Sequence, residues 1–341
     1  TIYAEATLAQ QYKVKKDGEV TGGPVYYIRA AFKGTFGKAL AAIFAILIVL
    51  ALGFTGNMVQ SNSIGAAFSE VFSARNIEIP SIVFGLILAA VIGFIFLGGV
   101  NRLASVVEKI VPIMAGIYIV GSLVLILMNI TALPGAIKMI FVGAFNPEAV
   151  VGAGAGIAVR EAIRFGVARG LFSNEAGMGS TPHAHARAKV ENPHKQGLAA
   201  MISVFIDTFI ILNLTVFSIL TTGVLDSGKE GTALTQAAFT KGFGNFGDIF
   251  VAVCLLFFAF STILGWHFFG EVNVKYLFGE KAAKFYSILV IGFVIVGSTL
   301  KVQLVWSLSD FFNGLMVIPN AIALWALSGV VVKICKQYGK K

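Results

Sequence analysis

Residues 169–180, Arg-Gly-Leu-Phe-Ser-Asn-Glu-Ala-Gly-Met-Gly-Ser, interrupt a chain that otherwise consists largely of apolar helical segments. The stretch places glycines, an amide, hydroxyl groups and two charges where neighbouring segments carry Leu, Ile and Phe. Because hydrocarbon cannot satisfy backbone polar groups, a broken helix is tolerated only where protein buries it or where it lines a cavity. The stretch therefore predicts a helix broken inside the membrane, which is the best sequence pointer to a substrate or ion site.

The composition of the 341-residue chain is that of an all-α polytopic membrane protein. Hydrophobic residues make up 57% and charged residues 13%, and the mean hydropathy is +0.85, which excludes an ordinary soluble domain. The net charge of +9 comes from short basic clusters between apolar runs. Such clusters orient a chain in a bilayer and do not form the basic stripe of a nucleic-acid-binding protein. Cys254 and Cys335 have no metal or redox spacing and are interpreted as structural.

Seven apolar runs are long enough to cross the hydrocarbon, which takes about 20 residues at a rise of ~1.5 Å each. They are Ala39–Phe68, Ile79–Leu97, Val106–Met128, Leu198–Leu220, Ile249–Phe269, Phe285–Leu300 and Leu304–Val332. An eighth span is needed between Gly152 and His185, where the hydropathy is weak and the broken stretch lies.

The distribution of Lys and Arg over the loops predicts their sidedness, because the excess marks the cytoplasmic side. Most of the 26 basic residues fall on one inferred side. This alternation holds only if residues 152–185 cross the membrane, so loop charge independently predicts that the weak segment spans. It also predicts a multi-pass protein of the plasma or inner membrane with a cytoplasmic C-terminus. Since the chain opens as if late in a helix, we expect further sequence upstream of Thr1.

Within the broken stretch, Gly170, Gly177 and Gly179 are expected to free the backbone from helical geometry. Amides and carbonyls exposed at such a break bind carboxylates or cations in transporters. Asn174 and Ser173 add side-chain donors and acceptors. The alternative is that the glycines serve close helix packing. The Asn and Glu that accompany them favour a site, although nothing in the stretch identifies the ligand.

The adjacent hydroxyls of Ser261 and Thr262 lie in the middle of an apolar run. Such a pair can join backbone carbonyls in the all-oxygen cage that a hard cation prefers. The alternative is that both hydroxyls bond back to the preceding turn of their own helix, and the pair taken alone favours this alternative. Trp266, one turn beyond, either lines an apolar pocket or anchors the helix near the interface.

A polar stripe follows one face of the first full span. Its members are Asn57, Gln60, Ser61 and Asn62. Amides in a membrane helix either join helices to one another or form the wall of a substrate site, and the sequence does not decide between these two roles.

Charged residues inside spans are functional candidates by default. Glu175 and Asp207 are the two acids least exposed to water by position, and Arg169 is expected to pair with one of them. The pairing would be a structural lock or a part of proton or cation coupling. Glu271 and Asp310 lie closer to span ends and are interpreted as interfacial acids.

Two histidines near Glu175, His183 and His185, suggest a zinc hydrolase. Helical zinc sites, however, place two His four residues apart with a Glu between them, and residues at i and i+2 of a helix point apart. The chain also has no Gly-x-Ser-x-Gly motif or phosphate-binding loop. Catalysis is therefore disfavoured. A channel would need a continuous polar pore, which a single broken span does not supply.

Several motifs together resemble the alanine or glycine:cation symporter family over the whole chain. They are Gly-Val-Ala-Arg-Gly-Leu-Phe-Ser-Asn-Glu-Ala-Gly-Met-Gly-Ser-Thr-Pro-His-Ala-His-Ala at 166–186, Thr-Gly-Gly-Pro-Val-Tyr-Tyr-Ile at 21–28, Tyr-Ala-Glu-Ala-Thr-Leu-Ala at 3–9 and Gly-Phe-Thr-Gly-Asn-Met-Val-Gln-Ser-Asn at 53–62. The first motif is long enough to be very specific.

The resemblance implies a LeuT-type fold, in which two inverted five-helix repeats carry broken first and sixth core helices. Residues 1–13 would then be the end of the second core helix, 152–185 the broken sixth and 249–269 the eighth. A Ser/Thr pair on the eighth helix binds sodium in LeuT-type folds, which implies a sodium site at Ser261 and Thr262. The family's first core helix and most of its second are not matched here, so we expect the opposite wall of the site to lie upstream.

The expected function is a secondary symporter that moves alanine or glycine into the cell with sodium, without enzymatic activity, cofactor or nucleic-acid partner. The residues expected to bind the substrate's polar groups are Asn174, Ser173, Gly177, Gln60 and Asn57. Phe172 and Trp266 are expected to limit the size of its side chain. Proton coupling through Glu175 or Asp207 is the nearest alternative.

Overall fold

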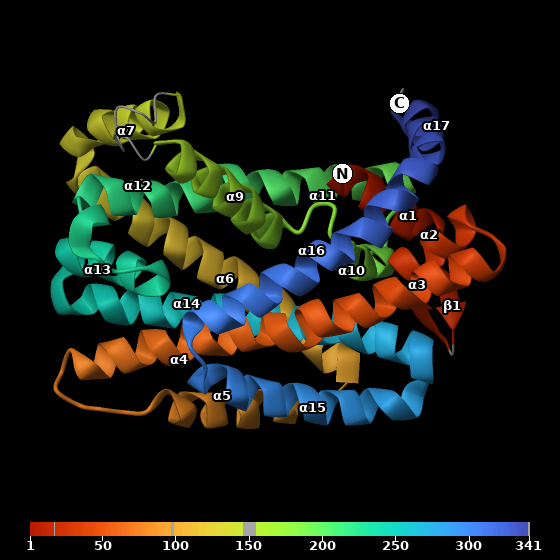
Figure 1. Cartoon of the computed structure of the whole chain (residues 1–341), viewed down its shortest axis with the longest axis horizontal. Coiled ribbons are helices and arrows are strands. Elements are labelled where there is room, and N and C mark those ends of the chain that lie inside the picture. The colour runs from red at the N-terminus through yellow and green to blue at the C-terminus, as the bar shows by residue number, and fades with distance from the viewer. Residues whose placement is uncertain (17, 97–98, 146–154, 340–341) are drawn as a thin grey trace.

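The computed structural model describes residues 1–16, 18–96, 99–145 and 155–339. Over these residues the regular elements are helices and one small antiparallel hairpin, in which Val14 pairs with Thr21. In this described part, 6 helices are long and apolar enough to cross a membrane. Figure 1 shows α4, α14 and α15 lying side by side along the long axis of the molecule. The all-helical, multi-span architecture predicted from the composition is confirmed.

The bounds of the elements follow chain order. The first group is α1 (Ile2–Gln11), β1 (Val14–Lys16), β2 (Glu19–Thr21), α2 (Pro24–Ala31), α3 (Gly34–Ile48), α4 (Asn57–Ser73), α5 (Ser81–Phe96), α6 (Gly99–Met128) and α7 (Leu133–Phe145). The second group is α9 (Ala155–Asn174), α10 (Pro182–Arg187), α11 (Pro193–Phe205), α12 (Leu212–Thr222), α13 (Gly231–Phe243), α14 (Gly247–Phe278), α15 (Glu280–Thr299), α16 (Val302–Ala326) and α17 (Ser328–Tyr338). Two π-helical segments, Val49–Gly56 and Ile206–Ile211, join α3 to α4 and α11 to α12.

Six of the seven clear spans are confirmed as helices long enough to cross a membrane. The run Ile79–Leu97 forms the shorter apolar helix α5, and Leu97 lies outside the described residues. The predicted end of the last span at Val332 is wrong. The helix α16 stops at Ala326, the chain turns at the buried Leu327, and α17 starts as a separate helix. A hydropathy profile cannot detect this turn because the apolar run continues through it.

A helix break is present within residues 169–180, although α9 is not among the 6 described helices that are long and apolar enough to cross a membrane, so the eighth span stays a prediction. The helix α9 ends at Asn174, residues 175–181 are not helical, and α10 begins at Pro182. Residues 152–154 of the predicted span lie outside the described residues. Gly177 and Gly179 adopt φ of +99° and +82°, a region that favours glycine. The role expected for Gly170 is wrong, because this residue sits inside α9, where a glycine is tolerated at modest cost.

The basic loops gather at one end of the molecule. In Figure 1 the hairpin strand β1, the junction of α14 and α15, and α17 lie at the right end, whereas α7 and α13 lie at the left end. This grouping agrees with the loop-charge count. Which of the two ends faces the cytoplasm remains a prediction.

The π-helical segment Val49–Gly56 packs directly against α14 beside the broken stretch. Its Gly56 approaches Trp266 so closely that an added Cβ would lie 2.7 Å from the indole ring. Single π-helical turns inside α-helices occur frequently at functional sites. This contact brings the polar stripe of the first span and Trp266 of α14 into one neighbourhood.

Candidate functional site

The end of α9 is closed by the side chains of the broken stretch itself. The Asn174 side-chain oxygen accepts a hydrogen bond from the backbone N–H of Ala176 (3.0 Å), a turn in which Asn mimics a backbone group. Glu175, which has a φ of +53°, accepts hydrogen bonds from the Ser180 hydroxyl and from Nε1 of Trp266, the latter at 2.6 Å. Glu175 therefore joins the two sides of the break to α14.

A buried acid on α1 holds the open backbone of the break. Glu5 is fully buried, and its carboxylate accepts hydrogen bonds from the backbone N–H groups of Gly177 (2.7 Å) and Gly179 (2.8 Å). Asn320 of α16 donates to the same carboxylate and to the Gly177 carbonyl, both at 2.8 Å. The Tyr27 hydroxyl in turn donates to the Asn320 side-chain oxygen. Both backbone groups of Gly177, which the sequence assigns to the substrate, already have protein partners in this structure.

Ser173 reaches a neighbouring span. Its hydroxyl donates to a carboxylate oxygen of Asp207 at 2.8 Å, and Asp207 lies half-buried in the π-helical segment Ile206–Ile211. The two intramembrane acids singled out by sequence, Glu175 and Asp207, are thus both bound to side chains within or beside the broken stretch.

The partner predicted for Arg169 is wrong. Arg169 forms a two-pronged ion pair with Asp310 of α16 (2.7 and 2.9 Å), rather than with Glu175 or Asp207. Its guanidinium also stacks 4.0 Å above the Trp306 ring. Asp310, interpreted from sequence as an ordinary interfacial acid, is therefore the partner. Helical spacing could not reveal this pair because α9 and α16 are separated by more than a hundred residues.

Phe172 and Trp266, the two residues expected to limit the size of the substrate's side chain, are in contact with each other. Their ring centroids are 5.3 Å apart in an edge-on arrangement, and the Trp306 ring also contacts Phe172, at a centroid distance of 5.0 Å. A hollow between α9 and α16 lies next to these rings, and its lining includes Phe172, Met178, Asp310 and Asn313. Aromatic side chains from three helices therefore converge beside the break.

The hydroxyls of Ser261 and Thr262 both donate to the carbonyl of Phe258, each at 2.9 Å. This is the back-bonding geometry that the sequence offers as the alternative to a cation site. Both hydroxyl oxygens lie one turn of α14 from Trp266. Each hydroxyl uses its proton in the bond to Phe258 and keeps its oxygen lone pairs, so this geometry by itself neither forms nor excludes a cation site.

The residues of the polar stripe on α4 differ in their hydrogen bonding. Asn62 donates to the carbonyls of Gly297 (2.9 Å) and Leu300 (2.7 Å) and so joins α4 to the end of α15. Asn57 is fully buried, donates to the Gly53 carbonyl, and keeps its side-chain oxygen without a hydrogen bond in the described structure. Gln60 is half-buried. Asn62 therefore joins helices, whereas Asn57 retains an unused acceptor.

The two histidines do not form a metal centre. The buried His183 contacts the Ser180 carbonyl at 2.7 Å and the Asn273 amide at 2.8 Å, while His185 contacts Gln196 at 2.8 Å. Over the residues that the structure describes, no group of three or more His, Cys, Asp or Glu side chains is placed to hold a metal ion. The geometry gives the hydrolase alternative no support.

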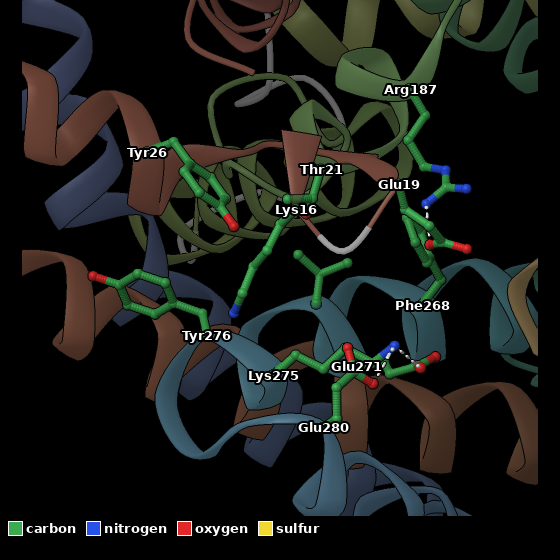
Figure 2. A pocket seen from close by; sticks show the side chains of 11 residues that line it. Lys16, Glu19, Thr21, Tyr26, Arg187, Phe268, Glu271, Lys275, Tyr276 and Glu280 are labelled. Atoms are coloured by element: carbon green, nitrogen blue, oxygen red, sulfur yellow. Dashed lines mark hydrogen bonds and ion pairs between the residues drawn. The ribbon is translucent and has the colours of Figure 1, made fainter. Parts of the chain in front are cut away.

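A separate cleft opens farther along α14, and Figure 2 shows its charged lining. Arg187 pairs with Glu19 at 3.2 Å, and Lys275 pairs with Glu271 (2.9 Å) and Glu280 (3.2 Å). None of the side chains that the sequence assigns to substrate or sodium lines this cleft. We therefore place the candidate site at the break and not here.

Sequence reasoning missed Glu5, Asn320 and Trp306. The first two carried a usable signal, because an acid in the apolar helix Ile2–Gln11 and an amide inside α16 are expensive in a membrane unless they have partners. Trp306 had no such signal, since a tryptophan near a span end is most simply an interfacial anchor.

Comparison with known sequences identifies relatives of the whole chain. Residues 1–341 match the family model described as the sodium:alanine symporter family. The chain is 42% identical over 340 residues to the amino-acid carrier protein AlsT of Bacillus subtilis (strain 168), which covers 99% of this chain and 70% of that protein. It is 41% identical over 341 residues to the probable sodium/glutamine symporter GlnT of the same organism (99% and 69%). The sodium/alanine symporter AgcS of Methanococcus maripaludis is 38% identical over 346 residues (100% and 74%).

Proposed function

Because the chain belongs to the sodium:alanine symporter family, which is a family of transporters and not of enzymes, we propose that it carries alanine or glycine into the cell together with sodium. The observation that carries this proposal is the break in the helix at residues 175–181. Side chains of α1, α14 and α16 form hydrogen bonds to it. We further propose that the chain has a LeuT-type fold, in which residues 1–13, 152–185 and 249–269 belong to the second, sixth and eighth core helices.

The substrate's polar groups are proposed to bind at Asn174 and Ser173, beside the turn at Gly177, with Asn57 and Gln60 on the facing helix. The unused side-chain oxygen of Asn57 supports this placement, because a buried acceptor without a partner is costly. An ammonium group of an amino acid supplies the missing donor. Phe172 and Trp266 would limit the side chain, since rings in edge-on contact leave little space between them.

Sodium is proposed to bind at Ser261 and Thr262, through the oxygen lone pairs that remain while each hydroxyl donates its proton to the Phe258 carbonyl. Oxygen ligands suit a hard cation, and the relative AgcS is named a sodium/alanine symporter. Coupling follows by linkage: if sodium stabilises the state that binds alanine, alanine must raise the affinity for sodium by the same factor.

The test is uptake of labelled alanine into proteoliposomes under separate sodium and pH gradients. We expect a sodium gradient alone to drive uptake. Ser261→Ala and Thr262→Ala should raise the sodium concentration for half-maximal uptake by at least tenfold, or ~1.4 kcal/mol. Ser203→Ala is the matched control, because that hydroxyl bonds to the Ala199 carbonyl on an exposed helix face. Uptake that ignores the sodium gradient would contradict the proposal.

Proton coupling remains the competing proposal, and one observation favours it: Asp207 is half-buried within a span and accepts a hydrogen bond from Ser173. Under sodium coupling, Asp207→Asn should keep sodium-driven uptake, since the amide still accepts from Ser173 through its oxygen. If uptake instead follows the pH gradient and Asp207→Asn abolishes that response, the carboxylate carries the coupling.

A further inference from the structure

We propose that Trp306 is a third wall of the side-chain pocket and sets the upper size limit of the transported amino acid, with Arg169 and Asp310 as the residues that position it. The inference rests on the proposed function, because it concerns the substrate of that same site. It adds a specificity determinant on α16 to the pair Phe172 and Trp266.

Phe172 is in contact with two tryptophans. Its ring lies 5.3 Å from Trp266 at an interplanar angle of 84° and 5.0 Å from Trp306 at 58°. The same ring packs against the main hydrophobic core and against a second cluster formed by Met58, Val59 and Val305. The three rings therefore form one continuous aromatic surface that runs from α14 across α9 to α16.

Trp306 is fixed in place by a charged pair. Asp310 and Trp306 are four residues apart, on neighbouring turns of α16, and both contact the guanidinium of Arg169. The two-pronged pairing with the carboxylate orients the guanidinium. Its central carbon lies 4.0 Å from the centroid of the indole ring, where a cation is attracted to an aromatic face. Arg169 in this way joins α9 to α16 through Trp306 itself.

The consequence for substrate size is steric. Centroid separations of 5.0 and 5.3 Å are direct ring contacts with no gap between the rings, so the substrate's side chain would lie against this aromatic surface, and a larger one would have to displace a ring. Displacing Trp306 also disrupts its contact with the guanidinium of Arg169. A methyl group or a hydrogen does not require this displacement, and alanine and glycine carry no more than that.

The experiment measures competition for alanine uptake in proteoliposomes with the full chain. In Trp306→Ala, glutamine and leucine should compete at least about tenfold better than in the wild type, because pocket volume discriminates side chains by roughly 10–200-fold. Trp306→Phe retains a ring and should restore most of the selectivity. Trp325→Ala is the matched control, because Trp325 lies on the same helix and is 87% exposed.

Asp310→Asn tests the positioning role, since it removes the charge that holds Arg169 but leaves the ring. We expect it to relax size selectivity in the same direction as Trp306→Ala and by a smaller factor. If Trp306→Ala transports alanine with unchanged competition by glutamine and leucine, the inference is wrong. If Trp306→Ala does not fold, unchanged selectivity in Asp310→Asn overturns it. A wild-type protein that moves neither alanine nor glycine contradicts the proposed function instead.

Discussion

Replacing Glu5 with alanine is expected to abolish transport and to destabilise the protein. The carboxylate accepts hydrogen bonds from Gly177, Gly179 and Asn320. Its removal leaves two buried backbone N–H groups without acceptors, at about 1–3 kcal/mol each, or ~2–6 kcal/mol in all. We expect initial alanine uptake to fall at least about a hundredfold, which corresponds to ~2.7 kcal/mol, together with a lower unfolding temperature in detergent.

Two further variants separate the carboxylate's role from a general loss of an acid. Glu5→Gln keeps the shape and one accepting oxygen but turns a donor toward one of the two amides, so it should be intermediate. Glu191→Gln is the control, because Glu191 is exposed and pairs with Lys195 on the surface, where an ion pair contributes about 0–1 kcal/mol. Wild-type uptake by Glu5→Ala would show that the break does not need this carboxylate.

Gly179→Ala is expected to have the second-largest effect. Gly179 has a φ of +82°, and an added Cβ would lie 2.7 Å from the Phe44 ring and 3.0 Å from Asn320. A left-handed conformation costs an L residue about 1–2 kcal/mol, and overpacking adds ~1–3 kcal/mol. We therefore expect a loss of ~2–5 kcal/mol in stability and little remaining uptake.

Alanine substitutions at two other glycines of the same stretch, Gly177 and Gly170, provide comparisons for Gly179→Ala. Gly177 has a φ of +99°, but the nearest atom would be 3.7 Å from an added Cβ. Gly177→Ala should therefore lose only the ~1–2 kcal/mol of stability that a left-handed backbone costs an L residue. Gly170 lies in α9 with open space around it, and Gly170→Ala should be neutral or stabilising by up to ~1 kcal/mol. The expected order of damage is Gly179, Gly177, Gly170, measured by thermal unfolding and uptake. Equal damage at Gly170 and Gly179 would contradict the geometry.

The sequence predicts what depends on local composition. Six spans and the break after Asn174 follow from hydropathy and from glycines among polar residues. The helix end at Ala326 could not be predicted, because Leu327 continues the apolar run while the chain turns. Local spacing likewise could not show that Gly170 remains helical whereas Gly177 does not, since the difference comes from the partners of the break.

The partners themselves depend on contacts between distant segments. The sequence suggests two acids within apolar segments, Glu175 and Asp207, as partners of Arg169. Its actual partner is Asp310 on α16. The acceptor for the Gly177 and Gly179 amides comes from Glu5, on a helix at the other end of the sequence. No periodicity connects such positions, and only the packing of α1 and α16 around the break reveals them.

The bonds of Glu5 also have a consequence for the synthesis of the protein. The acid emerges from the ribosome 172 residues before Gly177 and 315 residues before Asn320. At ~5–20 residues per second, the wait for the first partner, Gly177, is about 10–35 s. During that time an isolated carboxylate in hydrocarbon is unfavourable, so α1 must remain in contact with water or with the insertion machinery, or carry a proton. A nascent chain released before α16 therefore has an incomplete break, because the bonds from Asn320 to Glu5 and to the Gly177 carbonyl are missing.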